Sequence, residues 1–276
     1  MQLTHHASRI TSPLMLKRRL IPCLFLQNGL IVRSQEFTQF KQLGNPTAQL
    51  ERLNDWDSDE LIYVDITSDG SYDLKRDDLK TASRSDVLSI LRDISQHSFM
   101  PLTFGGRIRD LETVDAFIAN GADKVVINTG VVLNPELITQ VAEKYGSQAM
   151  VVAMDVKREA DGSYACYSHN GRERFAKPLR EWLKEVQQRG AGEIFLNSID
   201  RDGTANGYDH DIVNRVCEWA DVPVIACGGA GVFEDFEEVL AKTPASAIAA
   251  GNIFNFTENA YRRAKKFLRD AGANVR

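Results

Sequence analysis

A chain of 276 residues is long enough to bury the core of one large domain, and α/β barrels commonly have this length. Its hydrophobic content of 43% and charged content of 26% are typical of soluble globular proteins. The net charge of −5 argues against a general nucleic-acid binder, because no basic excess is available to neutralise a phosphate backbone. One local anion site remains compatible with this charge.

The first residues and the cysteines bear on the cellular compartment. Met1 to Leu16 contain no long apolar run and do not resemble a secretory signal, so we predict a flexible extension over 1–16 and a single domain over 17–276. No stretch approaches the roughly 18 apolar residues that a membrane-spanning helix needs. The cysteines lack metal-ligand spacing, and Cys23 and Cys227 lie inside apolar runs, which indicates buried thiols. We therefore expect a cytoplasmic protein without metal, cofactor or membrane partner.

Short apolar runs alternate with longer amphipathic stretches along the chain. The apolar runs predict strands at Leu20–Leu26, Leu61–Ile66, Pro101–Gly105, Lys124–Asn128, Ala149–Asp155, Glu193–Ser198, Val222–Cys227 and Ala245–Ala250. Several are almost continuously apolar, as is typical of parallel strands covered on both faces. Helical spacing predicts helices most clearly at Thr113–Asn120, Pro135–Tyr145, Lys177–Arg189, His210–Ala220, Phe233–Ala241 and Glu258–Ala271. This alternation predicts a (β/α)8 barrel rather than an open sheet.

An internal repeat supports the barrel. The segment MPLTFGGRIRDLETV, which starts at Met100, echoes VPVIACGGAGVFEDF, which starts at Val222, and each precedes a matching strand. The two segments lie roughly 120 residues apart, which corresponds to half a barrel. Two connections are longer than the rest, Gln27–Asn45 and Thr67–Ser85, and both leave the carboxyl ends of strands, where lids and binding loops occur. We expect a functional role for the first connection, whereas the second is either a binding loop or an insertion without chemistry.

Small residues follow several predicted strands where each strand gives way to a helix. Backbone N–H groups at such points can approach an oxyanion closely, and glycines after the seventh and eighth strands match the usual phosphate site of these barrels. A tight turn explains any one of them alone. After the third strand, the Arg107 guanidinium either binds an anion or fills the space. The candidate residues for a phosphorylated or anionic substrate are Gly105, Gly106, Arg107, Asn128, Thr129, Asn197, Asp202, Gly203, Thr204, Gly228, Gly229, Ala250 and Gly251.

Charged residues occur at both ends of the predicted strands. Asp155 ends the run AMVVAMD, where a rigid strand presents its carboxylate for proton transfer, the alternative being an ion pair with Lys157 or Arg158. The repeat pairs Asp155 with Phe25, so only one of two facing acids is present. Four charged residues each begin a strand, and a barrel gathers them at its amino-end face, where their spacing alone favours a stabilising ring of ion pairs. They are Arg19, Glu60, Lys124 and Glu193.

From about Lys17 to Arg276, the chain resembles the cyclase subunit of imidazole glycerol phosphate synthase, a (β/α)8 barrel of the histidine pathway. The resemblance rests on the motifs IPCL, DELIYVDIT, GADKVVINT, NPELI, GSQAMVVAMDVKR, GAGEIFLNSIDRDGTANGYD and PVIACGGAG. It implies that a glutaminase partner docks at the amino-end face, in an expected heterodimer, and releases ammonia. The ammonia would cross the barrel and react at the carboxyl-end mouth with a ribonucleotide that carries two phosphates.

The resemblance also implies roles for individual residues. Asp155 matches a catalytic aspartate, and Asp123 matches a contact to the glutaminase. Asn128 and Thr129 match part of one phosphate site. The other phosphate site matches Gly203, Gly229, Ala250 and Gly251. The ring of Arg19, Glu60, Lys124 and Glu193 matches a charged gate through which ammonia enters, so the resemblance favours a function for it.

Three departures from the family pattern concern the mouth. The other catalytic aspartate of the family aligns with Phe25, a phosphate-binding glycine aligns with Arg107, and a substrate-binding lysine of the first long loop aligns with Arg33. This pattern resembles a paralogue group that is thought to pass ammonia to an amidotransferase for acetamidino sugars of surface polysaccharides. We therefore expect a divergent paralogue of this kind. An active histidine-pathway cyclase and a non-catalytic scaffold that docks a glutaminase are the two alternatives.

Overall fold

The computed structural model describes residues 16–67, 72 and 86–276. Nearly all of the predicted extension over 1–16, and most of the predicted connection Thr67–Ser85, therefore lie outside the described residues. Within the described part of the chain, no helix is both long enough and apolar enough to cross a membrane.

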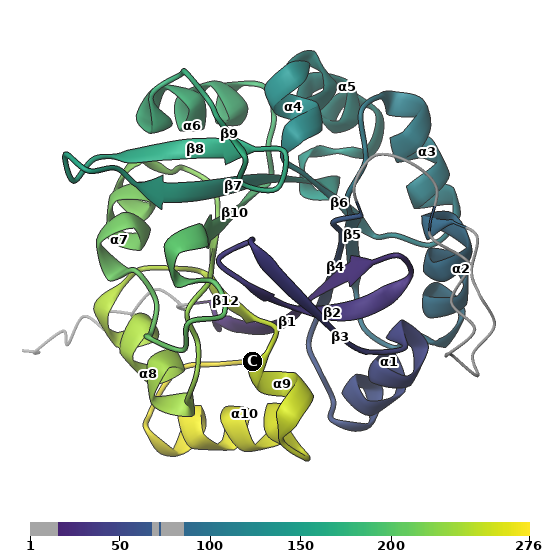
Figure 1. The fold of residues 1–276 in the computed structure, drawn as a ribbon, viewed down its shortest axis with the longest axis vertical. Helices are drawn as coiled ribbons and strands as arrows, with labels where there is room; N and C mark the ends of the chain where they lie inside the picture. Colours follow the sequence, from purple (N-terminus) through teal and green to yellow (C-terminus); the bar gives the residue numbers. More distant parts are fainter. Residues whose placement is uncertain (1–15, 68–71, 73–85) are drawn as a thin grey trace, which may run out of the picture.

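Eight parallel strands form a closed barrel, which confirms the predicted (β/α)8 fold (Figure 1). Each strand pairs with the next one in the chain, and the last pairs with the first through Arg19–Pro22 and Ala247–Ala250. The run of apolar residues in each strand explains this architecture, because one face packs on the helices and the other fills the barrel. The strands are β1 (Arg19–Gln27), β4 (Leu61–Asp65), β5 (Leu102–Gly105), β6 (Lys124–Ile127), β7 (Met150–Arg158), β10 (Glu193–Ser198), β11 (Val224–Cys227) and β12 (Ala247–Ala250).

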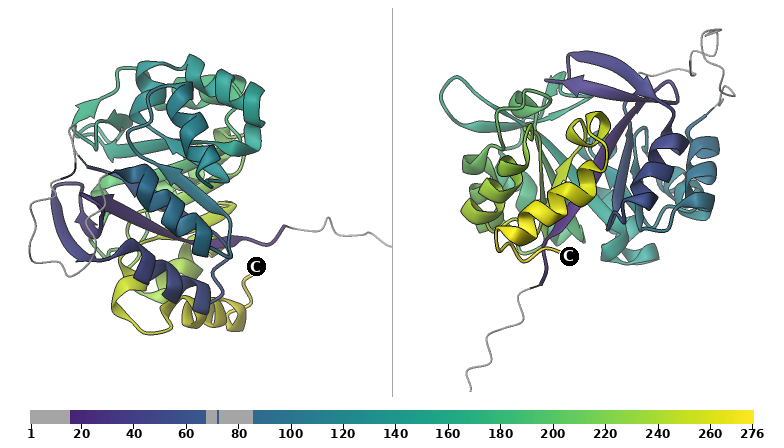
Figure 2. Two further views of the ribbon diagram at one scale, coloured as in Figure 1. Left: turned by 90° about the vertical axis from the view of Figure 1, so that its right-hand side faces the viewer. Right: turned by 90° about the horizontal axis from the view of Figure 1, so that it is seen from below.

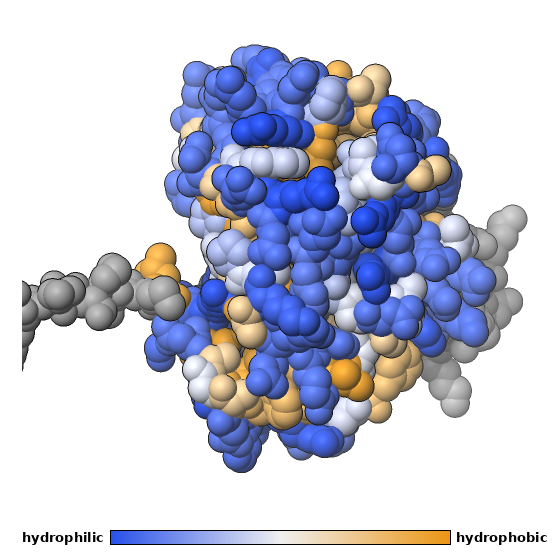
Figure 3. All heavy atoms as spheres, turned by 90° about the vertical axis from the view of Figure 1, so that its left-hand side faces the viewer, coloured by the Kyte–Doolittle hydropathy of each residue, from blue (hydrophilic) through white to orange (hydrophobic). Residues whose placement is uncertain are grey.

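Helices surround the barrel, and their ends follow local capping. Asp110, for example, accepts a hydrogen bond from the Thr113 backbone N–H, so the third helix begins two residues before the predicted Thr113. The outer helices are α1 (Pro46–Asp55), α2 (Val87–His97), α3 (Leu111–Ala119), α5 (Glu136–Tyr145), α6 (Leu179–Gln188), α7 (His210–Trp219), α8 (Phe233–Lys242) and α10 (Ala260–Asp270). Shorter turns are α4 (Thr129–Leu133), α9 (Ile253–Phe256), η1 (Ser147–Ala149) and η2 (Ile199–Arg201). Over α6, α7 and α8 the outer surface is mainly hydrophilic (Figure 3).

Two hairpins extend from the carboxyl-end face, and the sequence pattern did not indicate either of them. The predicted connection Gln27–Asn45 folds into β2 (Leu30–Gln35) and β3 (Gln39–Gly44), with β2 antiparallel to β1. A second hairpin continues β7 into β8 (Tyr164–Ser168) and the short β9 (Glu173–Arg174). The β2–β3 hairpin lies across one end of the barrel and the C-terminus lies at the other (Figure 2).

Inward-facing side chains fill the barrel with an apolar lumen. They form a buried cluster separate from the larger one between strands and helices. Cys23 and Cys227 belong to it, which confirms that these thiols are buried. The lumen cluster comprises Ile21, Cys23, Ile62, Val126, Val151, Ala153, Phe195, Ile225, Cys227, Ala247 and Ala249, with Phe25 and Val64 packed against it.

Candidate active site

The largest described cavity at the carboxyl-end face reaches from the rim down into the lumen. It has a volume of about 930 Å³, measured out to solvent. Three lumen residues, Val126, Ala153 and Phe195, form its floor. Asp155 lies in its wall, together with four of the predicted binding residues: Gly106, Arg107, Asn128 and Thr129. We call this space the first cavity.

Two amides from the neighbouring strands hold the Asp155 carboxylate. Asn128 Nδ2 donates to Oδ2 at 2.6 Å, and Asn197 Nδ2 donates to Oδ1 at 3.1 Å. Burial raises the pKa of Asp155 to about 6, because the lost hydration of the charged form outweighs both hydrogen bonds. A carboxyl group that titrates near neutral pH can both take up and release a proton.

The alternative ion pair of Asp155 with Lys157 or Arg158 does not form among the described residues. Lys157 Nζ donates to the Gly171 carbonyl at 3.3 Å. Arg158 instead lies 4.0 Å from the Asp211 carboxylate, at an exposed position. The basic residues that follow Asp155 in sequence therefore pair with other groups.

Asp65 is a second carboxylate in the first cavity, and our sequence reasoning missed it. It ends β4, is buried, and accepts hydrogen bonds from the Thr67 backbone N–H at 3.0 Å and from the Tyr72 hydroxyl at 2.9 Å. The Thr67 hydroxyl donates to the same carboxylate. Burial is the main cause that raises the pKa of Tyr72, which therefore remains a donor. The signal was present, since LIYVD ends in an aspartate as AMVVAMD does.

Phe25 stands at the top of the lumen between two cavities and offers no ionisable group. Its ring contacts Phe37 of the β2–β3 hairpin edge-to-face, with ring centres 5.5 Å apart. Both rings line the first cavity, and Phe25 also lines a second cavity of about 470 Å³. The two aromatic rings therefore form an apolar wall in the mouth.

The second cavity gathers most of the predicted residues of the second half-barrel. Its wall contains Asp202, Gly203, Gly228, Gly229, Ala250 and Gly251. Gly229 has a φ of +112°, and a Cβ there would lie 2.1 Å from the Gly207 carbonyl oxygen, so only glycine fits. Asp202 fixes the β2–β3 hairpin beside this cavity, because its carboxylate accepts from the Ser34 hydroxyl and its carbonyl accepts from the Glu36 N–H at 2.8 Å. Burial raises the pKa of Asp202.

Four predicted binding residues line neither cavity. Gly105 is buried beneath the first cavity, and Thr204 Oγ1 turns back to the Arg201 carbonyl at 2.9 Å. Arg33 lines a separate small recess on the β2–β3 hairpin. Asn197 is fully buried and contacts Asp155, its register partner on the neighbouring strand.

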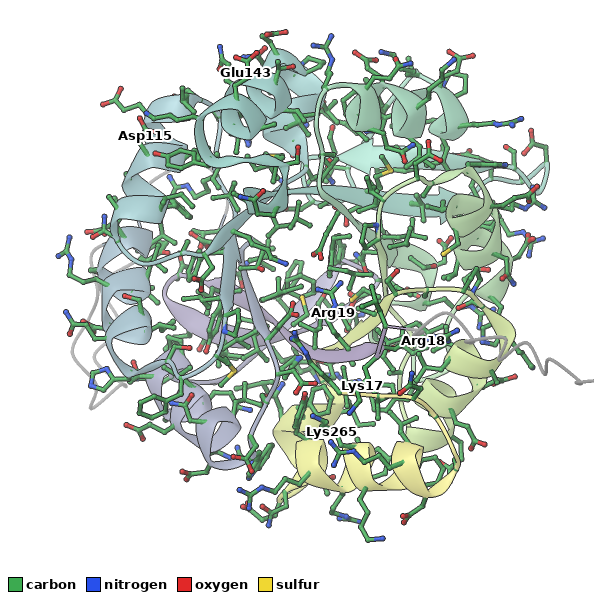
Figure 4. All side chains as sticks on the ribbon, turned by 180° about the vertical axis from the view of Figure 1, so that it is seen from behind. Lys17, Arg18, Arg19, Asp115, Glu143 and Lys265 are labelled. Atoms are coloured by element: carbon green, nitrogen blue, oxygen red, sulfur yellow. The ribbon has the colours of Figure 1, made fainter. Side chains whose placement is uncertain are left out.

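Ion pairs link the four charged residues at the opposite end of the barrel, where Figure 4 labels Arg19. Arg19 is 2.9 Å from Glu60 and 3.0 Å from Glu193, and Lys124 is 3.2 Å from Glu193. Within the described part of the chain no ion pair joins Lys124 to Glu60, so these residues form a chain of charges and not a closed ring. Arg276 also approaches Glu60, at 3.4 Å. We call Arg19, Glu60, Lys124 and Glu193 the charged cluster.

Asp123 lies on the same face and is exposed. Its carboxylate accepts from the Leu102 backbone N–H at 2.7 Å. It lines a shallow recess together with Phe99, whose side chain is 91% exposed. An exposed acid beside an exposed aromatic ring is suited to contact with another protein.

The fold and the site together define a class of protein: a (β/α)8 barrel with a mouth built from a carboxylate and glycine-lined cavities, above an apolar lumen and a charged cluster. Residues 19–259 match the family described as histidine biosynthesis protein, and the chain belongs to this family.

Its relatives agree with the resemblance in the motifs. We describe three of them, each named imidazole glycerol phosphate synthase subunit HisF. The protein of Alkaliphilus metalliredigens is 40% identical over 262 residues, which are 95% of this chain and all of the relative. That of Streptococcus mutans is 38% identical over the same shares, and that of Chlorobium limicola is 41% identical over 264 residues, again 95% of this chain and all of the relative. The predicted similarity to this cyclase subunit is confirmed.

Proposed function

We propose that this barrel is an ammonia-dependent enzyme of the imidazole glycerol phosphate synthase family, with an acceptor other than the histidine-pathway ribonucleotide. It takes ammonia from a glutaminase partner at its amino-end face and uses or passes it at its carboxyl-end mouth, in the cytoplasm. The observation that carries the proposal is the contrast between the two ends. The charged cluster and lumen suit the passage of ammonia, whereas Phe25 occupies a central position of the mouth.

The mainly apolar character of the lumen supports the passage of neutral ammonia. The lumen cluster is joined by one buried hydroxyl, that of Thr103, which pairs in register with Ile62, so a charged ammonium ion would lose its hydration without gaining a charged partner. Neutral ammonia loses far less. The charged cluster at the entrance offers carboxylates that can accept hydrogen bonds from incoming ammonia.

The residues of the mouth support an acceptor other than the histidine-pathway ribonucleotide. Asp155 supplies one group for proton transfer, but the phenyl ring of Phe25 cannot supply a second. Arg107, Arg109 and Arg172 line the first cavity, which favours a phosphorylated or otherwise anionic acceptor. Our finer hypothesis is that the ammonia serves acetamidino-sugar synthesis, through transfer to an amidotransferase.

An active histidine-pathway cyclase is the second candidate. It is supported by the names of the relatives, by their identity of about 40%, and by Asp155 at the end of β7. In that case Asp155, with Asp65 in the same cavity, would carry the reaction without a carboxylate at residue 25.

Turnover of the histidine-pathway ribonucleotide with excess ammonium salt separates these candidates, because ammonium salt replaces the glutaminase. We expect no turnover by the native protein and a gain of at least about 100-fold over background in Phe25→Asp. Phe25→Asn is the matched control, since it has the same shape as the aspartate without the acid. Turnover by the native protein at the rate of an ordinary cyclase would contradict the proposal. If all three folded proteins are inactive, the changed acceptor is supported and sugar substrates are tested next.

A further inference from the structure

Asn197 is a fully buried side chain with an unused hydrogen-bond acceptor. Along β10, every second residue faces the barrel axis: Glu193 belongs to the charged cluster and Phe195 to the lumen cluster. Asn197 is the next inward residue, directly above the lumen. Its Oδ1 atom is buried and has no hydrogen-bond partner among the described residues.

The orientation of the Asn197 amide is fixed by Asp155. Nδ2 must face the carboxylate, at 3.1 Å, because two oxygen acceptors would repel one another. Oδ1 therefore points away from Asp155 and toward the end of β11. There Gly228 carries no side chain, and a Cβ would lie 3.2 Å from Oδ1. The oxygen itself is buried, and Gly228 next to it lines the second cavity together with Cys23 and Cys227.

A purely structural role explains this arrangement poorly. An unsatisfied buried acceptor costs about 1–3 kcal/mol, and the hydrogen bond from Nδ2 to Asp155 leaves the burial of Oδ1 unexplained. Asn128 already holds the same carboxylate, at 2.6 Å. The oxygen of Asn197 is thus the feature that needs a ligand, and that ligand must donate hydrogen bonds and be small.

We infer that Asn197 is a positioning residue that receives ammonia where the lumen opens into the mouth. This inference rests on the proposed function, in which ammonia crosses the lumen. Ammonia has three N–H donors and one lone pair. One N–H donates to Asn197 Oδ1, and the Nδ2 atom of the same amide carries the effect to the Asp155 carboxylate. The lone pair of ammonia remains available to an acceptor in the second cavity.

Direct binding of ammonia tests the inference without a partner or an acceptor. The protein is prepared with isotope-labelled aspartate, and the Asp155 carboxyl signal is identified by its loss in Asp155→Asn. The NMR shift of that signal is followed while ammonium chloride is added at alkaline pH, where neutral ammonia is present. Sodium chloride at equal ionic strength is the salt control. We expect a saturable shift with ammonium chloride alone.

Three variants separate the oxygen of Asn197 from its hydrogen bond to Asp155. Asn128→Leu removes the other donor to Asp155 but keeps Asn197 Oδ1, so we expect saturable binding to persist. Asn197→Leu should weaken the binding at least about tenfold. Asn197→Thr should restore part of it, because a hydroxyl both donates and accepts.

Equal responses of Asn197→Leu and the native protein would overturn the inference. So would the same shift in both salts, or no shift at all, since Oδ1 would then hold a trapped water only. The inference and the proposed function can fail separately. If the protein binds ammonia saturably but forms no complex with a glutaminase, the proposed partner is wrong and the role of Asn197 is still supported.

Discussion

The behaviour of Asp155 follows from its surroundings. Its pKa of about 6 lies above the ordinary value of 3.8, because burial disfavours the charged form more than the Asn197 and Asn128 amides favour it. Asp161, in contrast, is fully exposed, and hydrogen bonds from Ser163 lower its pKa. The same residue type is thus prepared for proton transfer at one position and remains ionised at the other.

This raised pKa predicts a pH-dependent stability. The folded protein binds the Asp155 proton more tightly than the unfolded chain does, so stability falls as the pH rises from 3.8 through about 6. We expect the native protein to lose roughly 2–3 kcal/mol relative to Asp155→Asn between about pH 4 and about pH 7. Urea unfolding of both proteins at the two pH values measures this. Relative to Asp161→Asn, the exposed control that retains Asp155, the native protein should show no such loss, and an unchanged difference for Asp155→Asn would contradict the prediction.

Sequence predicted some of the site residues and could not predict others, for physical reasons. Asp155 was found because an aspartate at the end of an apolar strand points into a barrel mouth, and Asp65 could have been found by the same argument. The amide clamp on Asp155 depends on distances between three strands, which no local pattern encodes. Arg107 has a φ of +60°, a left-handed conformation that its sequence context did not indicate.

Among the elements, the β2–β3 hairpin has the most direct bearing on the mouth. It brings Phe37 onto Phe25, and it is tied to the loop after β10 by Ser34, Glu36 and Asp202. Asn252, after β12, also donates to the Ser34 carbonyl at 3.2 Å. This hairpin therefore contributes to both cavities, Phe37 to the first and Val32 to the second.

Removing the Asp202 carboxylate should make the β2–β3 hairpin more mobile. In Asp202→Ala the Ser34 hydroxyl and the Phe37 N–H lose a buried acceptor, which is worth about 1–2 kcal/mol. We expect backbone amides over 30–44 to exchange with solvent deuterium roughly tenfold faster, as measured by mass spectrometry. Lys41→Ala, a change in the same hairpin, is the control that should exchange at the native rate. If both variants behave alike, Asp202 does not hold the hairpin.

The barrel strands were predictable, and the hairpins were not. A buried parallel strand reads as a continuous apolar run, which is how all eight barrel strands were located to within a few residues. In β3, the sequence QFKQLG has no buried residue, and β9 has only two residues, so neither gives a hydrophobic signal. Such strands form because a neighbouring strand offers free backbone groups, and sequence pattern does not show that.

At the scale of the whole molecule, the barrel joins two ends that differ in chemistry. The charged cluster lies at the amino-end face, the lumen cluster fills the middle, and Asp155 with the two cavities lies at the carboxyl-end face. The internal repeat predicted the closed barrel, because two half-barrels form a closed sheet only when β12 pairs with β1. The central claim is that ammonia from a partner enters at the amino-end face.

Binding of a glutaminase subunit from the same organism tests this claim most directly, because docking needs neither an acceptor nor a working mouth. Size-exclusion chromatography with light scattering gives the stoichiometry, and glutamine hydrolysis by the glutaminase is measured on mixing. We predict a one-to-one complex with stimulated hydrolysis, unaffected by Phe25→Asp at the mouth and weakened at least about tenfold by Asp123→Lys on the amino-end face. Absence of a complex between folded proteins, or a complex that Phe25→Asp disrupts and Asp123→Lys does not, would contradict it.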